Sequence, residues 1–458
     1  MTERGEPKGE RRRGGGRPPA DRPERREPPG RLLVAGGRVV DPSQGIDETA
    51  DVLLEDREVA RLDERIEPGE LGGEVEVVDA SGLVVCPGLV DLHVHLREPG
   101  QEYKETVETG TRAAAAGGFT AVACMPNTVP PIDHRAVVES IVTEAERWGY
   151  ARVHPVGAVS KGMAGESLAE IGEMVRAGAV AISDDGLPVA HAELMRRAFL
   201  YARHFGIPVT QHAEDLQITG DGVMHEGEWS TRLGLPGIAG VSEDVVVARD
   251  LILAAETGGR YHVAHLSTAR SLELVREAKR RGVRVTCEVT PHHLVLTDRA
   301  VADTGFSTDT KMKPPLRSEA DRAALVAGLA DGTVDAIASD HAPHHRDEKD
   351  VEFSLAPFGI LGLETTLSLC LDRLVHAGEI PLARLVELLS TGPARAYGLA
   401  GGTLAPGSPA DVTLFDPDRE VTVDRTAFRS KSRNTPFHGW KLRGAPVRTI
   451  LGGRLVEA

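Results

Sequence analysis

Short apolar runs alternate with amphipathic segments through the middle of the chain, from residue 89 to residue 397. This alternation is the pattern of parallel strands joined by crossover helices. The segment 105–116, for example, predicts a helix that Gly117 and Gly118 end, and Phe119 begins the next strand. Eight strands are predicted, and they end at LVDLHVH, TAVACMPN, RVHPVGAVS, AVAISDDG, PVTQHAED, RYHVAHLS, RVTCEVTPHH and VDAIASDHAPH. The predicted fold class is therefore α/β, a closed (β/α)8 barrel of the TIM type rather than a doubly wound open sheet.

The two ends of the chain carry a different pattern. Residues 31–88 and 398–458 contain short β-type runs separated by turns, such as RLLVAGGRVVD and ADVTLFD. We expect these two segments to meet as one composite β-sandwich domain, which flanks a catalytic barrel of residues 89–397. Residues 1–30 are rich in Arg, Gly, Pro and Glu and nearly devoid of apolar side chains, which predicts a disordered tail.

Composition and charge exclude several classes of function. The formal net charge is −16 at pH 7 and no basic stripe with interleaved aromatics is present, so we expect no nucleic-acid partner. With 41% hydrophobic and 27% charged residues, the chain has the composition of a globular protein, and we expect no membrane partner. The tail has no apolar stretch of a signal peptide, which predicts a cytoplasmic protein. Four cysteines lie far apart in apolar runs, and we interpret them as reduced core residues: Cys86, Cys124, Cys287 and Cys370.

Polar side chains follow almost every predicted strand at its carboxyl end, the face on which barrel active sites are built. His93 and His95 alternate along one strand, so both imidazoles face the same side. The remaining predicted ligands end four other strands and are Asp185, His212, His265 and Asp340. Four imidazoles and two carboxylates predict a metal centre for one or two ions per subunit, and the nitrogen-rich set favours Zn²⁺ in a binuclear site. For the first pair alone, two satisfied core histidines are the alternative interpretation.

The ordered series of motifs PGLVDLHVHLREPG, MPNT, SDDG, QHAED, AHLS, TPHHL, PPLR and SDHAPH resembles the amidohydrolase superfamily and, within it, the bacterial type I dihydroorotases. The resemblance covers nearly the whole chain from about residue 31, and it implies a barrel of the metal-dependent hydrolase kind. It also implies the reversible, zinc-dependent cyclisation of N-carbamoyl-L-aspartate to L-dihydroorotate, a step of de novo pyrimidine (UMP) biosynthesis.

The resemblance implies a role for several of the polar residues at the strand ends. Hydantoinases, allantoinases and animal dihydroorotases place a carboxylated lysine between their metals, whereas the fourth strand here has no lysine. Its second aspartate, Asp185, aligns with the bridging aspartate of the bacterial enzymes, and Asp184 becomes a neighbour that we expect to hydrogen-bond nearby. In the implied mechanism a metal-bridged hydroxide attacks the ring amide, while Asp340 takes the proton and passes it to the leaving ring nitrogen.

The resemblance also implies the substrate contacts. Dihydroorotate keeps a free carboxylate, and Arg97, two residues after His95, is placed to bind it through paired hydrogen bonds. The other predicted contacts are Asn127, Lys313, His344, Phe358 and Gly359. Lys313 departs from the family pattern, because the motif reads KMKPPLR where relatives often read KMNPPLR. We expect its ammonium either to add a charge contact to the carboxylate or to disturb the contact with the ring.

Two alternatives to a dihydroorotase stay open. One is a sister cyclic amidase such as a hydantoinase or allantoinase, and the other is a non-catalytic scaffold partner of aspartate transcarbamoylase. Scaffold proteins of this kind typically lose metal ligands, whereas all six predicted positions are present here. Family members are often dimers, and some assemble with aspartate transcarbamoylase, so we expect a homodimer and consider that complex a further candidate assembly.

Overall fold

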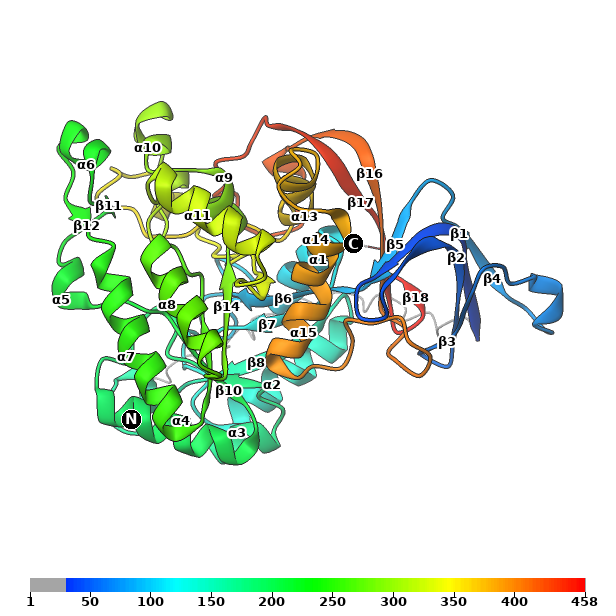
Figure 1. Ribbon diagram of the computed structural model, residues 1–458, viewed down its shortest axis with the longest axis horizontal. Coiled ribbons are helices and arrows are strands. Elements are labelled where there is room, and N and C mark those ends of the chain that lie inside the picture. The colour runs from blue at the N-terminus through cyan, green and yellow to red at the C-terminus, as the bar shows by residue number, and fades with distance from the viewer. Residues whose placement is uncertain (1–29, 458) are drawn as a thin grey trace, which may run out of the picture.

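Eight parallel strands form a barrel in the middle of the chain (Figure 1), in a computed structural model that describes residues 30–457. Neighbours in the sheet follow the order β15-β14-β13-β10-β9-β8-β7-β6, so each barrel strand pairs with the next one along the chain. The eight strands lie in the eight predicted segments and are β6 (Leu89–Val94), β7 (Phe119–Cys124), β8 (Arg152–Gly157), β9 (Ala181–Ile182), β10 (Pro208–Gln211), β13 (Arg260–Val263), β14 (Val285–Val289) and β15 (Ala336–Ile337).

The barrel closes between its first and last strands. Val94 at the end of β6 forms a parallel bridge with His341, just beyond β15. His95 donates its backbone N–H to the His341 carbonyl at 2.9 Å. This contact places the polar segments that follow β6 and β15 side by side, and the predicted (β/α)8 fold class is confirmed.

Helices cover the outside of the barrel because their apolar stripes pack on the strands. In α4, for instance, Phe199 is fully buried and meets Tyr261 of β13 edge to face, with ring centroids 5.7 Å apart. Burying one such side chain contributes about 1.5–3 kcal/mol. The covering helices are α1 (Val107–Ala116), α2 (Arg135–Trp148), α3 (Ile171–Arg176), α4 (Ala192–Phe205), α7 (Val241–Thr257), α8 (Ala269–Arg280), α11 (Glu319–Ala330), α13 (Thr366–Cys370), α14 (Leu382–Val386) and α15 (Gly392–Tyr397).

Short elements interrupt the loops at the carboxyl ends of the strands. They are α5 (Leu216–Thr219), β11 (Met224–His225), α6 (Glu228–Leu233), β12 (Gly237–Ile238), α9 (Pro291–Val295), α10 (Arg299–Asp303) and α12 (Arg346–Lys349). Thr290 caps α9, because its side chain accepts the His293 backbone N–H. Loops of this size on a rigid barrel can carry the binding groups of an active site.

A second sheet of eight strands combines both ends of the chain. Its order is β18-β17-β16-β5-β1-β2-β3, with β4 paired to β1, and β16 runs antiparallel to β5. Figure 1 shows the blue N-terminal strands beside the orange and red C-terminal ones, next to the barrel. The strands are β1 (Arg31–Asp41), β2 (Ile46–Glu55), β3 (Glu58–Asp63), β4 (Glu76–Asp79), β5 (Val84–Pro87), β16 (Val412–Thr422), β17 (Lys441–Leu451) and β18 (Arg454–Leu455). A flanking β-domain built from both chain ends is thus confirmed, and its predicted boundaries stay predictions.

Three other features concern the cysteines, the length of the helices and the N-terminal tail. All four cysteines are free and buried, as predicted for reduced core residues. No helix within residues 30–457 is both long enough and apolar enough to cross a membrane. The predicted disordered tail lies outside the described residues, apart from Gly30 at its end.

Candidate metal centre and active site

Imidazoles and carboxylates from separate strands converge at the carboxyl end of the barrel. His93 Nε2 lies 3.4 Å from Asp185 Oδ2, and His95 Nε2 lies 3.2 Å from Asp340 Oδ1. All four side chains are buried. Ligand atoms of His93, His95 and Asp340 lie within 4.8 Å of one another, which is close enough for one ion to contact all three.

A second group of ligands shares His93 with the first and adds Asp185 and His265. His265 Nε2 lies 3.5 Å from Asp185 Oδ1, and the ligand atoms of His93, Asp185 and His265 again fall within 4.8 Å of one another. His212 Nδ1 lies 2.9 Å from His265 Nε2 and 3.9 Å from Asp185 Oδ1. Asp185 therefore turns Oδ2 toward one histidine pair and Oδ1 toward the other, as a bridging carboxylate would, and all six predicted ligands lie together.

The hydrogen bonds around the first histidine pair fit a bound cation. His93 Nδ1 lies 2.8 Å from Glu288 Oε1, and His95 Nδ1 lies 2.8 Å from Asn127 Oδ1. Because these oxygens accept a proton held on Nδ1, the Nε2 of each ring faces a carboxylate, and either a second ring proton or a metal ion must lie between them. Two lone pairs facing each other are stable only with a cation between them. Moreover, His93 Nε2 and Asp185 Oδ1 are buried and have no hydrogen-bond partner among the described residues. The donor set thus fits divalent metal ions.

Charges at the site shift the pKa of its members in opposite directions. Burial alone would lower the pKa of His93, but the charges of Asp185 and Asp340 raise it well above its ordinary value. Burial would raise the pKa of Asp340, yet the charge of His93 and a hydrogen bond from His95 lower it instead. Protons on the rings and a metal ion therefore compete for the same carboxylate charge.

Backbone strain is concentrated in the same place. Among the described residues, seven that are not glycine have a positive φ, and three of them are predicted site residues: Arg97 (60°), His265 (33°) and Asp340 (44°). Such conformations cost roughly 1–3 kcal/mol each and persist where surrounding contacts enforce them. Their position at the ends of three different strands is typical of a functional site rather than of a flexible loop.

Arg97 and His344 form a buried pair beside the ligands. The Arg97 guanidinium donates from Nε to the Pro343 carbonyl at 3.2 Å, and its Nη2 lies 3.5 Å from His344 Nε2. Burial lowers the pKa of Arg97 to about 10, so it is still a cation at neutral pH. Burial and the Arg97 charge lower the pKa of His344, whose neutral ring donates from Nε2 to the Phe358 carbonyl at 2.8 Å. A Cβ at Gly359 would lie 2.6 Å from both the Ala342 carbonyl oxygen and the His344 ring, so glycine is required there.

Other residues singled out in the sequence occupy related positions. Asp184 accepts hydrogen bonds from the backbone N–H groups of Val159 and Ser160, at 2.8 and 3.0 Å, and so holds the loop after β8. Lys313 is at the mouth as well, but its Nζ lies 3.0 Å from Glu214 Oε1 and 5.2 Å from the centroid of the Phe358 ring.

Sequence reasoning missed three residues that support the site. Glu288 in β14 accepts from His93 and from His262, whose Nε2 lies 3.1 Å away. Glu214 Oε2 lies 3.1 Å from His212 Nε2. Asn434 accepts the His344 backbone N–H and donates to the carbonyls of Ala342 and Gly359, all at 3.0 Å. An acidic residue inside the apolar run VTCEV was a usable signal for Glu288, whereas the segment around Asn434 offered none.

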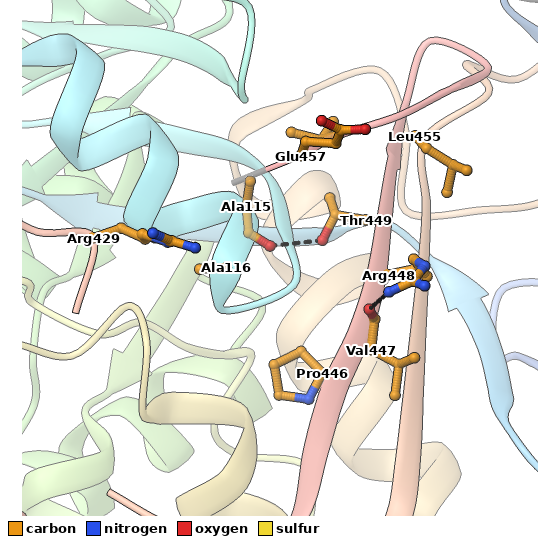
Figure 2. A pocket seen from close by; sticks show the side chains of 10 residues that line it. Ala115, Ala116, Arg429, Pro446, Val447, Arg448, Thr449, Leu455 and Glu457 are labelled. Atoms are coloured by element: carbon orange, nitrogen blue, oxygen red, sulfur yellow. Dashed lines mark hydrogen bonds between the residues drawn. The ribbon is translucent and has the colours of Figure 1, made fainter. Parts of the chain in front are cut away.

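Two cavities lie away from this mouth. One, of about 500 Å³, lies between the end of α1 and β17, where Thr449 donates to the Ala115 carbonyl at 2.7 Å (Figure 2). Arg429 and Arg448 line it, but the carbonyl end of α1 makes it unfavourable for an anion. The other, of about 760 Å³, includes Arg152, which is already paired with Asp411 at 2.7 Å. Neither cavity is lined by any of the six predicted ligands, so we place the chemistry at the barrel mouth.

Comparisons with known proteins agree with this geometry. Residues 82–271 match the family model described as Dihydro-orotase-like. A dihydroorotase of Anaeromyxobacter dehalogenans (strain 2CP-C) is 57% identical over 426 residues, which cover 93% of this chain and 98% of the relative. The chain belongs to the dihydroorotase family. A second dihydroorotase, of Syntrophotalea carbinolica, is 54% identical over 425 residues, covering 93% of this chain and 98% of the relative.

A solved structure extends the likeness to sister enzymes of the dihydroorotase family. The L-hydantoinase (dihydropyrimidinase) from Arthrobacter aurescens superposes with a TM-score of 0.82 at 29% identity, covering 93% of this chain and 95% of that one. The barrel and its flanking β-domain are therefore common to both groups of cyclic-amide hydrolases. The higher identity to dihydroorotases favours that activity over the hydantoinase alternative.

Proposed function

We propose that this protein interconverts N-carbamoyl-L-aspartate and L-dihydroorotate at the mouth of its barrel. The observation that carries the proposal is the position of Asp185, which offers one oxygen to each histidine pair. Asp340 lies beside this bridge, and the buried cation Arg97 lies beyond it. A centre of this kind, next to a cation for a substrate carboxylate, suits hydrolysis and formation of a cyclic amide that carries a carboxylate.

The proposed cofactor is Zn²⁺, with two ions per subunit. His93 and His95 would hold one ion and His212 and His265 the other, with Asp185 between them and Asp340 on the first. Imidazole-rich ligand sets suit zinc better than magnesium or calcium. When bound, the ions would supply Lewis acidity and lower the pKa of a water molecule toward neutrality.

Asp340 is the proposed catalytic residue, because it can hold and move a proton beside the scissile amide. Its lowered pKa keeps the carboxylate ionised at neutral pH, ready to act as a general base. In the hydrolytic direction it accepts the proton of the attacking water and delivers that proton to the leaving ring nitrogen. In the direction of ring closure the same carboxylate takes a proton from the carbamoyl nitrogen as the N–C bond forms, and it delivers that proton to the hydroxyl that the protonated side-chain carboxyl group of the substrate loses as water.

Substrate orientation is assigned to the groups around Arg97. Its guanidinium binds the substrate carboxylate through paired hydrogen bonds, and the backbone at Phe358 and Gly359 faces the pyrimidine edge. His344 holds the Phe358 carbonyl in place and contacts Arg97. Asn127 uses Oδ1 to orient His95, which leaves its amide NH₂ to reach the substrate.

The test is turnover of both substrates by purified protein loaded with zinc, cobalt or manganese, with metal content measured on the same samples. Formation of dihydroorotate from N-carbamoyl-aspartate, and the reverse reaction, is the expected result. Turnover of hydantoin or allantoin without turnover of dihydroorotate would instead assign the sister activity. Absence of all turnover in metal-loaded, folded protein would favour the scaffold alternative.

The predicted homodimer, the complex with aspartate transcarbamoylase and the cytoplasmic location stay predictions. Sedimentation of the purified protein, alone and mixed with aspartate transcarbamoylase from the same source, measures the first two directly. A single species at the mass of the 458-residue chain would contradict the homodimer.

A further inference from the structure

Glu214 connects a predicted metal ligand, His212, to Lys313. Its Oε2 lies 3.1 Å from His212 Nε2, and its Oε1 lies 3.0 Å from Lys313 Nζ. The Glu214 side chain is only 6% exposed, so it has little room to leave this position. Both of its oxygens are thus engaged, one by an imidazole and the other by an ammonium.

The contact with His212 decides which ring nitrogen faces the metal centre. A carboxylate can only accept, so the His212 proton lies on Nε2 and the Nδ1 lone pair is free. That Nδ1 is the atom 2.9 Å from His265 Nε2 and 3.9 Å from Asp185 Oδ1. His93 and His95 show the opposite arrangement, because their Nδ1 atoms meet Glu288 and Asn127. His265 also turns Nε2 toward Asp185, so His212 alone among the four histidines turns Nδ1 toward the centre.

The contact with Lys313 fixes where its charge acts. Its ammonium lies against Glu214 and over the ring of Phe358, at 3.0 and 5.2 Å. The backbone of this segment is fixed as well, since the neighbouring Pro314 carbonyl oxygen lies 3.0 Å from His293 Nε2. A cation compensated by a buried carboxylate is a weak partner for a second carboxylate.

We propose that Glu214 is a positioning residue that presents His212 to the metal centre through Nδ1, and that Lys313 is the counter-ion of Glu214 rather than a ligand of the substrate carboxylate. The inference rests on the proposed metal-dependent function. It assigns Glu214 a role through His212 and leaves carboxylate recognition to Arg97.

Metal affinity of single and double variants tests the proposal. Glu214→Gln keeps the shape but removes the charge, and we expect the more weakly held ion to bind about 10–100-fold less tightly. In the wild-type background, Lys313→Met removes the ammonium that holds Glu214 in place, which should weaken metal binding. The same change removes a positive charge that repels the metal ion, which should strengthen metal binding. Because these effects oppose each other, we expect metal affinity to change less than about threefold. In the Glu214→Gln background there is no glutamate charge for Lys313 to hold, and only the repulsion between its ammonium and the metal ion remains. Lys313→Met should therefore tighten metal binding at least about fivefold.

The readouts are chelator competition with Zn²⁺, the visible spectrum of the cobalt-loaded protein, and KM for dihydroorotate. Glu226→Gln, an exposed glutamate in the same part of the chain, is the matched control. Thermal unfolding of each variant confirms that it folds. Wild-type zinc affinity in folded Glu214→Gln overturns the role of Glu214, and equal effects of Lys313→Met in both backgrounds overturn the pairing. If Lys313→Met alone raised KM for dihydroorotate more than about tenfold, Lys313 would instead be a ligand of the substrate. Failure of the proposed function is distinct, because wild-type protein would then lack turnover whatever the variants bind.

Discussion

Glu288 offers the sharpest test of how the barrel supports its metal centre. The change is Glu288→Gln, which preserves shape at a side chain that is fully buried. Its Oε1 accepts from His93 Nδ1 at 2.8 Å and its Oε2 from His262 Nε2 at 3.1 Å. Burial alone would raise the pKa of Glu288, but hydrogen bonds from His262 and His93 lower it to about 2, so the group is a carboxylate at neutral pH.

The expected magnitude follows from replacing a charged acceptor with a neutral one. A hydrogen bond to a charged group contributes about 1.5–3 kcal/mol and a neutral one about 0.5–1.5 kcal/mol, so the His93 contact loses about 1–1.5 kcal/mol. With about 1.4 kcal/mol per factor of ten, metal affinity should fall about tenfold. Loss of a negative charge near a divalent ion extends the effect toward 100-fold, the upper end of the range of about 10–100-fold for such partners.

The fold should tolerate this change. The glutamine oxygen can still accept from His93, and its NH₂ can donate to His262 Nε2, because His262 Nδ1 has Thr286 Oγ1 at 2.7 Å as an acceptor. The assay is chelator competition for zinc on folded protein, with exposed Glu352→Gln as control. Unchanged zinc affinity in folded Glu288→Gln would refute the view that this carboxylate sets the basicity and orientation of His93.

Three further predictions concern the same site. Asp340→Asn should retain most bound metal while kcat falls roughly 10²–10⁴-fold, whereas Asp185→Ala should lose metal, and equal metal content in the two variants would contradict these roles. Arg97→Met should raise KM for dihydroorotate about 10–100-fold, the loss of one charge-assisted contact, with little change in metal content. The raised pKa of His93 means that protons compete with the metal ion for this ring, so zinc affinity should weaken as pH falls. Zinc binding should then release protons, which calorimetry in buffers of different ionisation enthalpy would detect.

Local patterns in the sequence were enough to locate the repeating units and the polar residues at their ends. Period-two and period-3.6 patterns are local, so the eight strand segments could be located before any contact was known. Because parallel strands share one carboxyl edge, His93, Asp185 and Asp340 could be expected to lie together. Family motifs then supplied the roles, and the structure brings these side chains to one mouth.

The way those side chains are held depends on contacts between distant parts of the chain. Glu288 meets His93 across 195 positions of the chain, and Asn434 reaches His344 across 90. Lys313 also meets Glu214 instead of standing free in the pocket. Local periodicity carries no information on such pairs, because they depend on barrel closure and on the paths of loops. Hydrogen-bond partners within about 3 Å are fixed by that global geometry, and it sets the ring nitrogens that face the metal centre.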